Sequence, residues 1–414
     1  MSQITKTDFP GGAIYALQTE RKDLVVMQGS YMGGHVHAPN DALVHLMVHM
    51  LDQGTTQFSK DRLSEDLESM GIHIDFDYDA YRTYFSVATL KDVWSKSLEY
   101  LKSQLVDSAF EPQAFAVMKD RLVGMEKERL SDTKVQAMTS FLEGLYEPSH
   151  PNYQIPTKEF ISQIEAVDRD EVVSFYGSQK QRGQINMALV GDVNQEMVDD
   201  LIQLFSDWGQ SDRAIIAPQN PGKSVSAVMK QSISGKVSAD VIMGGALGMS
   251  HTHPDYLPLR VGLDALGGNM SARLMQTVRD KDGLTYGIYT HLRGASDKSD
   301  GSWHIWANYA PDKIQQGIDA TQVQLARWKK DMSDDEINRR IEGLRGTYML
   351  SMASCAGLAN LIHRYTKQGY DQNYVFQYPE VLKNITPEQV RKAINEHVDI
   401  DNLLTVIVGE LGDV

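Results

Sequence analysis

Cysteine, basic charge and long apolar runs are all scarce in this sequence. Among its 414 residues Cys355 is the one cysteine, so no internal disulfide can form and a disulfide-stapled secreted domain is disfavoured. No apolar run reaches the length of a membrane span, and the first residues lack the features of a signal peptide. We therefore expect a cytoplasmic protein as written, or a periplasmic or organellar one if a leader has been removed.

Acidic residues outnumber basic ones, 55 to 40, and the formal net charge is −15. This balance argues against nucleic acid as a partner, because phosphate binding requires a basic patch. A field of this sign attracts cationic peptides, although a well-solvated acidic surface is its commoner meaning. Hydrophobic residues make up 42% of the chain, which suits a soluble protein of two or more domains.

Two halves of the chain resemble each other. The segment INMALVGDVNQ, which begins at Ile185, resembles LLTVIVGELGD near the end, and Gly191 aligns with Gly409 at an offset of 218. Before each segment stands a helical pattern, with Asp168 or Thr386 as the predicted N-cap. We expect an internal duplication.

A third pair of segments supports the duplication, because RLVGMEKE aligns with GLRGTYML at an offset of 222. Between the halves lies a stretch rich in Gly, Pro, Ser and Asn, which is typical of an exposed linker. We predict an N-terminal domain over 1–212, a linker over 213–226 and a C-terminal domain over 227–414.

Strand-like and helix-like stretches alternate within each half. HIDFDYDAYRTYFSVATL alternates polar and apolar residues, whereas VWSKSLEYLKSQLV has helical periodicity. The alternation suits an antiparallel sheet with one covered face rather than a doubly wound parallel sheet. The predicted fold class is α+β, with two homologous domains that each hold a largely antiparallel sheet covered by helices.

Two histidines stand four residues apart in the apolar stretch ALVHLMVHMLDQG. We expect a helix here with Asp41 as its N-cap, and on a helix His45 and His49 share one face. Such a pair can bind zinc, which gains from one further protein ligand such as Glu126 on a later helical segment. On spacing alone, two packed structural histidines are the commoner reading.

The stretch ALVHLMVHMLDQGT resembles the inverted His-x-x-Glu-His zinc motif of the pitrilysin and insulinase family of metallopeptidases. In that family the third ligand is a glutamate at a fixed, long spacing after the second histidine. Counted from His49, this spacing ends at position 126, which is Glu126. The resemblance implies zinc bound by His45, His49 and Glu126.

The second half also resembles this family. LGGNMSARLMQTVRDKDGLTYGIY matches its Gly-rich turn, its Ser-x-Arg-Leu and its Arg-x-x-x-Gly-Leu-x-Tyr. By this resemblance, Arg279 and Tyr286 would hold the substrate and the oxyanion. Without it, these residues read as a surface helix residue and a residue at the sheet edge. Together the matches cover both halves and imply half of a peptidase clamshell.

Val48 occupies the position of the motif glutamate, the base that accepts the proton of the zinc-bound water. Valine has no lone pair and cannot do this. A second departure is Lys119, where catalytic relatives often carry another glutamate. It reads more readily as a solvated helix face than as a charge directed at the metal.

Nearby side chains offer substitutes for the missing base. His35, His37 and Asp41 precede the histidine helix, and Asp52 lies near its end. A neutral histidine has a suitable pKa for proton transfer. Loop, capping and surface roles are nevertheless the commoner explanations of these four residues.

Three functions stay open. The first is a subunit of a zinc peptidase that lacks the base and contributes Arg279 and Tyr286 to a homologous zinc-bearing partner, with unfolded peptides as substrates. The second is a non-hydrolytic peptide-binding or structural protein, and the third an active zinc peptidase with a substitute base. The partner would be a different subunit or a second copy of this chain, and zinc binding is expected because its ligand set is present.

Overall fold

The computed structural model describes residues 3–179, 183, 185–208, 220–296 and 298–411. The chain divides into a first unit (1–124, 160–215 and 348–378) and a second unit (125–159, 216–347 and 379–414). Each unit thus includes a segment from the other half of the sequence. The boundaries 1–212 and 227–414 stay a prediction, and much of the predicted linker, 213–226, lies outside the described residues.

The first unit is built on a six-stranded sheet in the order β1-β2-β6-β3-β5-β4. Its neighbouring strands are antiparallel except β2 and β6, which are parallel. The strands are β1 (Thr5–Phe9), β2 (Gly12–Gln18), β3 (Leu24–Met32), β4 (His73–Tyr78), β5 (Arg82–Leu90) and β6 (Ile185–Gly191). In this order β4 lies at one end of the sheet, where it pairs with β5.

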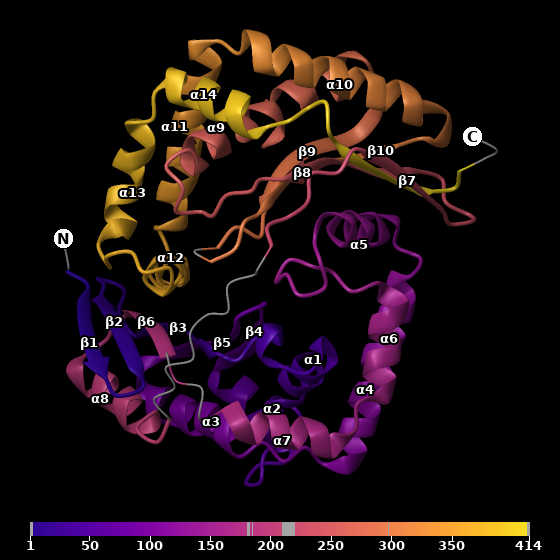
Figure 1. Ribbon diagram of the computed structural model, residues 1–414. Coiled ribbons are helices and arrows are strands. Elements are labelled where there is room, and N and C mark those ends of the chain that lie inside the picture. The colour runs from indigo at the N-terminus through magenta and orange to yellow at the C-terminus, as the bar shows by residue number, and fades with distance from the viewer. Residues whose placement is uncertain (1–2, 180–182, 184, 209–219, 297, 412–414) are drawn as a thin grey trace. The chain divides into compact units, whose positions relative to one another are not determined.

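Helices cover both faces of this sheet (Figure 1). Apolar residues of α3 and α8 join those of the strands in one core, whereas α12 packs against β3 and β6. The helical segments of the unit are η1 (His35–His37), α1 (Asp41–Met50), α2 (Lys60–Met70), η2 (Lys91–Val93), α3 (Trp94–Val106), α7 (Arg169–Gln179), α8 (Gln195–Leu204) and α12 (Cys355–Lys367).

The second unit is built on a five-stranded sheet in the order β7-β11-β8-β10-β9. Here β7 and β11 are parallel and the other neighbours antiparallel. The strands are β7 (Ala227–Ser232), β8 (Ala239–Ala246), β9 (Thr285–Arg293), β10 (Ser302–Tyr309) and β11 (Leu404–Gly409). The two sheets therefore share one plan, in which β6 corresponds to β11 and β4 to β9.

Helix α5 packs against β8 and β11, and α9 packs against β9 and α14. The helical segments of this unit are α5 (Thr133–Leu145), α9 (Tyr256–Gly267), η3 (Met275–Lys281, a π-helix), η4 (Pro311–Lys313), α10 (Ile314–Asp331) and α14 (Pro387–His397). The division between the units falls within four more helices, α4 (Pro112–Arg129), α6 (Thr157–Ala166), α11 (Asp334–Ser351) and α13 (Tyr374–Lys383).

The helix boundaries confirm the internal duplication. The first residues of α4 and α11 stand at an offset of 222, and so do those of α5 and α12. The first residues of α7 and α14 stand at an offset of 218, so both offsets of the sequence alignment recur in the structure. The predicted caps are also confirmed, because Asp168 accepts from the Glu171 amide and Thr386 forms a capping box with Gln389.

The expectation of one covered face is wrong for the centre of each sheet. Every residue of β6 and β11 is buried, whereas β4 alternates exposed and half-buried residues. The reason is the exchange of helices, since α12 covers a second face at β6 and α5 does so at β11. Across the described residues, no helix combines the length and apolarity that a bilayer crossing requires.

Candidate active site

Helix α1 carries the histidine pair in the first unit. Its N-cap is Asn40, whose side chain accepts from the Leu43 amide at 3.1 Å, so the expectation of Asp41 as the cap is wrong by one residue. The helix packs against α7 and β4, and seven of its ten residues are buried. His45 and His49 are partly exposed, and their ring centroids lie 4.4 Å apart.

Hydrogen bonds orient both imidazole rings. The Nδ1 of His49 lies 2.8 Å from the backbone carbonyl of His45, which can only accept, so this nitrogen carries the proton. A neutral His49 therefore has its lone pair on Nε2, the arrangement that metal-binding histidines use. The Nδ1 of His45 lies 3.0 Å from the hydroxyl of Tyr78, at the end of β4. Sequence reasoning missed Tyr78, because only the β4–β5 hairpin brings it to the helix.

Val48 is 5% exposed and is part of the packed side of α1. Its isopropyl group provides no proton acceptor beside the two histidines. The donors of this helix thus fit a zinc ion, whereas the base of a hydrolytic site is missing from it.

Glu126 lies on α4 and is 5% exposed. Its Oε1 accepts a hydrogen bond of 2.9 Å from Arg129, one turn later. A buried carboxylate is a suitable third zinc ligand by its chemistry. Glu126 belongs to the second unit and the two histidines to the first, so the complete ligand set of three stays a prediction.

Three of the four residues considered as substitute bases, His35, Asp41 and Asp52, have local partners. His35 Nδ1 lies 2.7 Å from Asp41 Oδ2, so these two form a dyad that begins on the first turn of α1. Asp52 Oδ1 accepts from the side chain of Gln53.

Lys119 lies on α4 and was expected on a fully solvated helix face. It is half-buried and donates to the carbonyl of Val167 at 2.7 Å, so this expectation is wrong.

Arg279 and Tyr286 come together in the second unit. Arg279 lies in η3 and donates from Nε to the backbone carbonyl of Tyr286 at 2.9 Å, while its guanidinium carbon lies 5.8 Å from the tyrosine ring centre. Its Nη1 donates to Asp280 at 2.7 Å. Tyr286, on the end strand β9, is 88% exposed. A large aromatic side chain this exposed is available to a ligand.

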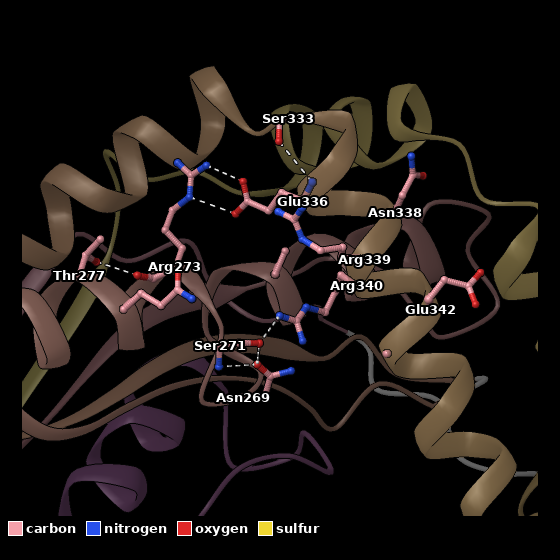
Figure 2. A pocket seen from close by; sticks show the side chains of 13 residues that line it. Asn269, Ser271, Arg273, Thr277, Ser333, Glu336, Asn338, Arg339, Arg340 and Glu342 are labelled. Atoms are coloured by element: carbon pink, nitrogen blue, oxygen red, sulfur yellow. Dashed lines mark hydrogen bonds and ion pairs between the residues drawn. The ribbon is translucent and has the colours of Figure 1, made fainter.

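A cavity of about 940 Å³ adjoins η3 in the same unit (Figure 2). Arg273 points to Glu336 in a two-pronged ion pair with distances of 3.2 and 2.7 Å. Arg340 reaches Ser271 from the opposite wall, and its Nε lies 3.2 Å from Asp264. Burial raises the pKa of Asp264. The sequence motif Ser-x-Arg-Leu thus supplies lining and bracing residues of this cavity.

Two protein-family models match the sequence of this chain. The model described as insulinase, peptidase family M16, matches residues 30–143, and the model of the peptidase M16 inactive domain matches residues 166–344. The two matches together span more than half of the chain. The protein belongs to the M16 peptidase family. The resemblance expected from the histidine motif and from the second-half signature is confirmed.

The alignments with several relatives cover nearly the whole of this chain. An uncharacterized zinc protease of Streptomyces coelicolor is 23% identical over 99% of this chain and 90% of its own length. A protein of Helicobacter pylori named as a non-peptidase homolog is 20% identical over 91% of this chain and 86% of its own length. The solved M16 inactive domain of Pseudomonas fluorescens has a TM-score of 0.87 at 16% identity, with 99% and 98% of the chains covered. The last comparison confirms the α+β fold with two sheets.

Proposed function

We propose that this M16 chain is a subunit of a zinc-dependent peptidase that acts on peptides or unfolded segments. In this proposal it lacks the glutamate base and contributes Arg279 and Tyr286 to a homologous, zinc-bearing partner subunit. The supporting observation is the contrast between the two units. Val48 leaves the histidine helix without a base, whereas Arg279 and Tyr286 are in contact and the tyrosine is open to solvent.

The chemistry assigned to Arg279 and Tyr286 follows from their donors. A guanidinium and a phenol both donate hydrogen bonds, and neither supplies a base at neutral pH. Placed beside a scissile carbonyl, they would stabilise the negative charge that its oxygen develops in the transition state. Zinc, when bound, would supply Lewis-acid polarisation of that carbonyl and of a bound water.

The peptide itself would bind as an added strand. Strand β4 ends one sheet and β9 ends the other, so each offers backbone groups along one side. In the first unit Tyr78 of β4 contacts His45, and in the second unit β9 carries Tyr286, so each end strand carries a residue assigned a role above. Backbone pairing of this kind tolerates many sequences, which suits a peptidase of unfolded segments.

Cleavage of quenched fluorescent peptides tests the assignment. We expect no turnover by the chain alone and chelator-sensitive turnover once the cognate zinc-bearing M16 subunit is added. Arg279→Ala should lower that turnover by roughly a hundredfold. Arg327→Ala, which removes an exposed arginine from α10, is the matched control and should leave it unchanged. Equal turnover with Arg279→Ala and with wild type would remove the assignment.

A non-hydrolytic peptide-binding protein on the same scaffold is the second candidate. It is favoured by the relative that carries the name non-peptidase homolog. In that case extended peptides would bind to the chain without turnover in any combination with candidate partners.

An active peptidase with a substitute base is the third candidate, and the His35–Asp41 dyad favours it. A carboxylate bonded to Nδ1 orients an imidazole and makes its Nε2 a better proton acceptor. Asp41, His45 and His49 follow one another at four-residue spacing on α1, so the dyad begins on the face that carries the histidine pair. Chelator-sensitive cleavage by the lone chain that His35→Gln abolishes would establish this candidate.

A further inference from the structure

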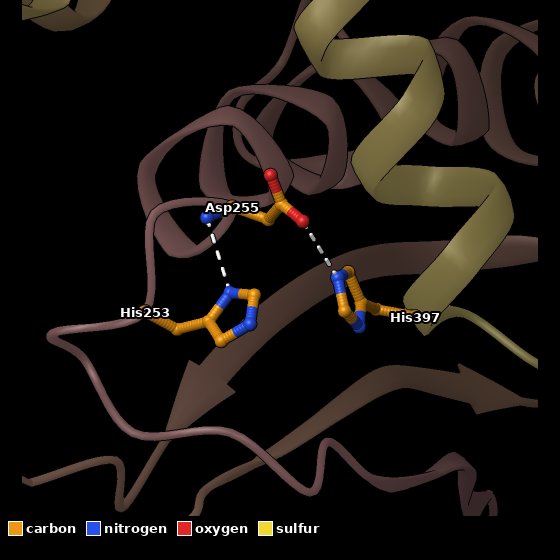
Figure 3. A group of neighbouring side chains, drawn as sticks. All are labelled: His253, Asp255 and His397. Carbon is orange, nitrogen blue, oxygen red and sulfur yellow. Dashed lines mark hydrogen bonds and ion pairs between the residues drawn. The ribbon is translucent and has the colours of Figure 1, made fainter.

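A second group of metal-ligating side chains lies entirely within the second unit (Figure 3). His253 and Asp255 stand in the turn that leads into α9, and His397 is the last residue of α14. Asp255 occupies the N-cap position of α9, yet its carboxylate makes no cap hydrogen bond. Its Oδ2 instead lies 3.0 Å from Nε2 of His397. Capping offers this carboxylate little, because Pro258 at the third helical position has no N–H and the Tyr256 amide donates to the His253 carbonyl, so the carboxylate is left to face the histidines.

We propose that His253, Asp255 and His397 form a transition-metal site of the zinc type, distinct from the histidine pair on α1. Over the described ranges this is the one group of at least three His, Cys, Asp or Glu side chains whose ligand atoms all lie within 4.8 Å of one another. Two imidazoles and one carboxylate are a common zinc set, with water as the fourth ligand.

The distances suit a shared ion. Two ligands that each lie about 2 Å from one zinc ion are separated by roughly 3 Å or a little more. The Asp255 and His397 atoms already have this separation. The rings of His253 and His397 lie 5.2 Å apart at 78°, so the first needs a small movement to bring a nitrogen into the same sphere.

The protonation states of the three side chains determine which of their atoms can bind the metal ion. An aspartate carboxylate is ionised at neutral pH, which is the form in which it binds a metal ion. His253 Nδ1 accepts from the Asp255 amide at 3.1 Å, which places the proton of the neutral ring on Nε2. Metal binding would use the Nδ1 lone pair in place of that amide, or a rotated ring. The proton on His397 Nε2 would leave for Nδ1 or for solvent.

The position of the site indicates a structural role. His397 and Asp255 are 142 residues apart in sequence, so an ion here would join the end of α14 to the start of α9. Helix α9 packs against β9, the strand that carries Tyr286. All three side chains are partly buried, which leaves a solvent path for the ion. The inference does not depend on the proposed peptidase function.

Titration of the metal-free full chain with zinc, monitored by calorimetry, tests the site. The visible spectrum of a sample loaded with cobalt in place of zinc reports the ligands. The first step uses His45→Gln/His49→Gln, which removes the predicted zinc site on α1. We expect this variant to keep about one equivalent of bound zinc and a zinc-dependent rise in Tm. Absence of stoichiometric binding in this variant would overturn the proposal.

In the same background, His253→Gln/His397→Gln should weaken zinc binding by about tenfold or more and abolish the Tm rise. Asp255→Asn is a milder second variant, because it retains a polar N-cap residue for α9. His73→Gln removes an exposed histidine of β4 and is the matched control. Unchanged zinc affinity in the folded Asp255→Asn variant and in the double variant would also overturn the proposal.

Discussion

The Nδ1 of His49 lies 2.8 Å from the backbone carbonyl of His45, one turn earlier on the same helix. This bond presents Nε2 of His49 as a metal donor, although the adjacent Val48 cannot act as a base. The helix therefore presents two imidazoles on one face, as the proposed zinc motif requires, and has no water-activating group at Val48. Introducing a glutamate at position 48 tests whether the missing base is what prevents hydrolysis.

Val48→Glu should give the lone chain chelator-sensitive peptidase activity. A positioned general base contributes about 10²–10⁴-fold to such reactions. Cleavage of fluorescent peptides by the variant, with and without chelator, is the measurement. Because Val48 is 5% exposed, we also expect a loss of stability of about 1–3 kcal/mol from the larger side chain.

Val48→Gln is the control for this substitution, since glutamine has a similar size but accepts no proton at neutral pH. It should share the stability loss and remain inactive. If Val48→Glu binds zinc as the wild type does and is no more active than Val48→Gln, the helix lacks more than its base.

Gly191, at the end of β6, should not tolerate alanine. Its φ of +136° is outside the range that L side chains adopt readily, and a Cβ there would lie 2.0 Å from the Leu24 carbonyl oxygen. We expect Gly191→Ala to lower the free energy of unfolding by at least about 2 kcal/mol. Chemical denaturation of both proteins at one pH measures the difference.

Gly177→Ala provides the opposite case. Gly177 is exposed within α7, and a Cβ there would meet nothing within 4 Å. Alanine should raise the stability of this helix by roughly 0.5–1 kcal/mol, because it loses less backbone entropy than glycine on folding.

The prediction for Gly191 would be contradicted by a Gly191→Ala protein as stable as the wild type. That result would mean that β6 and β3 can move apart without a loss of stability.

The glycines show how far the sequence could predict the structure. Alignment of the halves paired Gly191 with Gly409, and both prove sterically required, since a Cβ at Gly409 would lie 2.5 Å from that of Ala239. The same alignment paired Gly124 with Gly346, where a Cβ would meet nothing within 4 Å. Repetition alone therefore does not distinguish a constrained glycine from a neutral one.

Local patterns predicted local elements, and contacts between distant segments lay beyond them. The helical spacing of His45 and His49, and the caps at Asp168 and Thr386, depend on neighbours within one or two turns. The contact of Tyr78 with His45 depends on a hairpin, and the exchange of α5 and α12 between units depends on tertiary packing. The grouping of the two histidines at the α9 and α14 ends likewise joins distant parts of the sequence, which no local pattern shows.

His304 should make the second unit sensitive to acid. It is 3% exposed on β10, and burial lowers its pKa to about 3, with smaller effects from the charges of His291, Arg293 and Lys134. The folded chain therefore leaves this ring neutral, whereas the unfolded chain protonates it near pH 6.5. The stability that the neutral ring provides is complete above about pH 6.5 and is lost progressively as the pH falls toward 3.

The expected loss is at most about 1.4 kcal/mol per pH unit, which corresponds to one proton. His304→Leu should flatten the plot of unfolding free energy against pH between about 6.5 and 4, because leucine takes up no proton in either state. His73→Leu, at an exposed position of β4, should leave the slope unchanged. If His304→Leu does not alter the slope of unfolding free energy against pH, other groups cause the acid sensitivity. The buried His363 of the first unit, whose pKa burial also lowers, would then be the next residue to substitute.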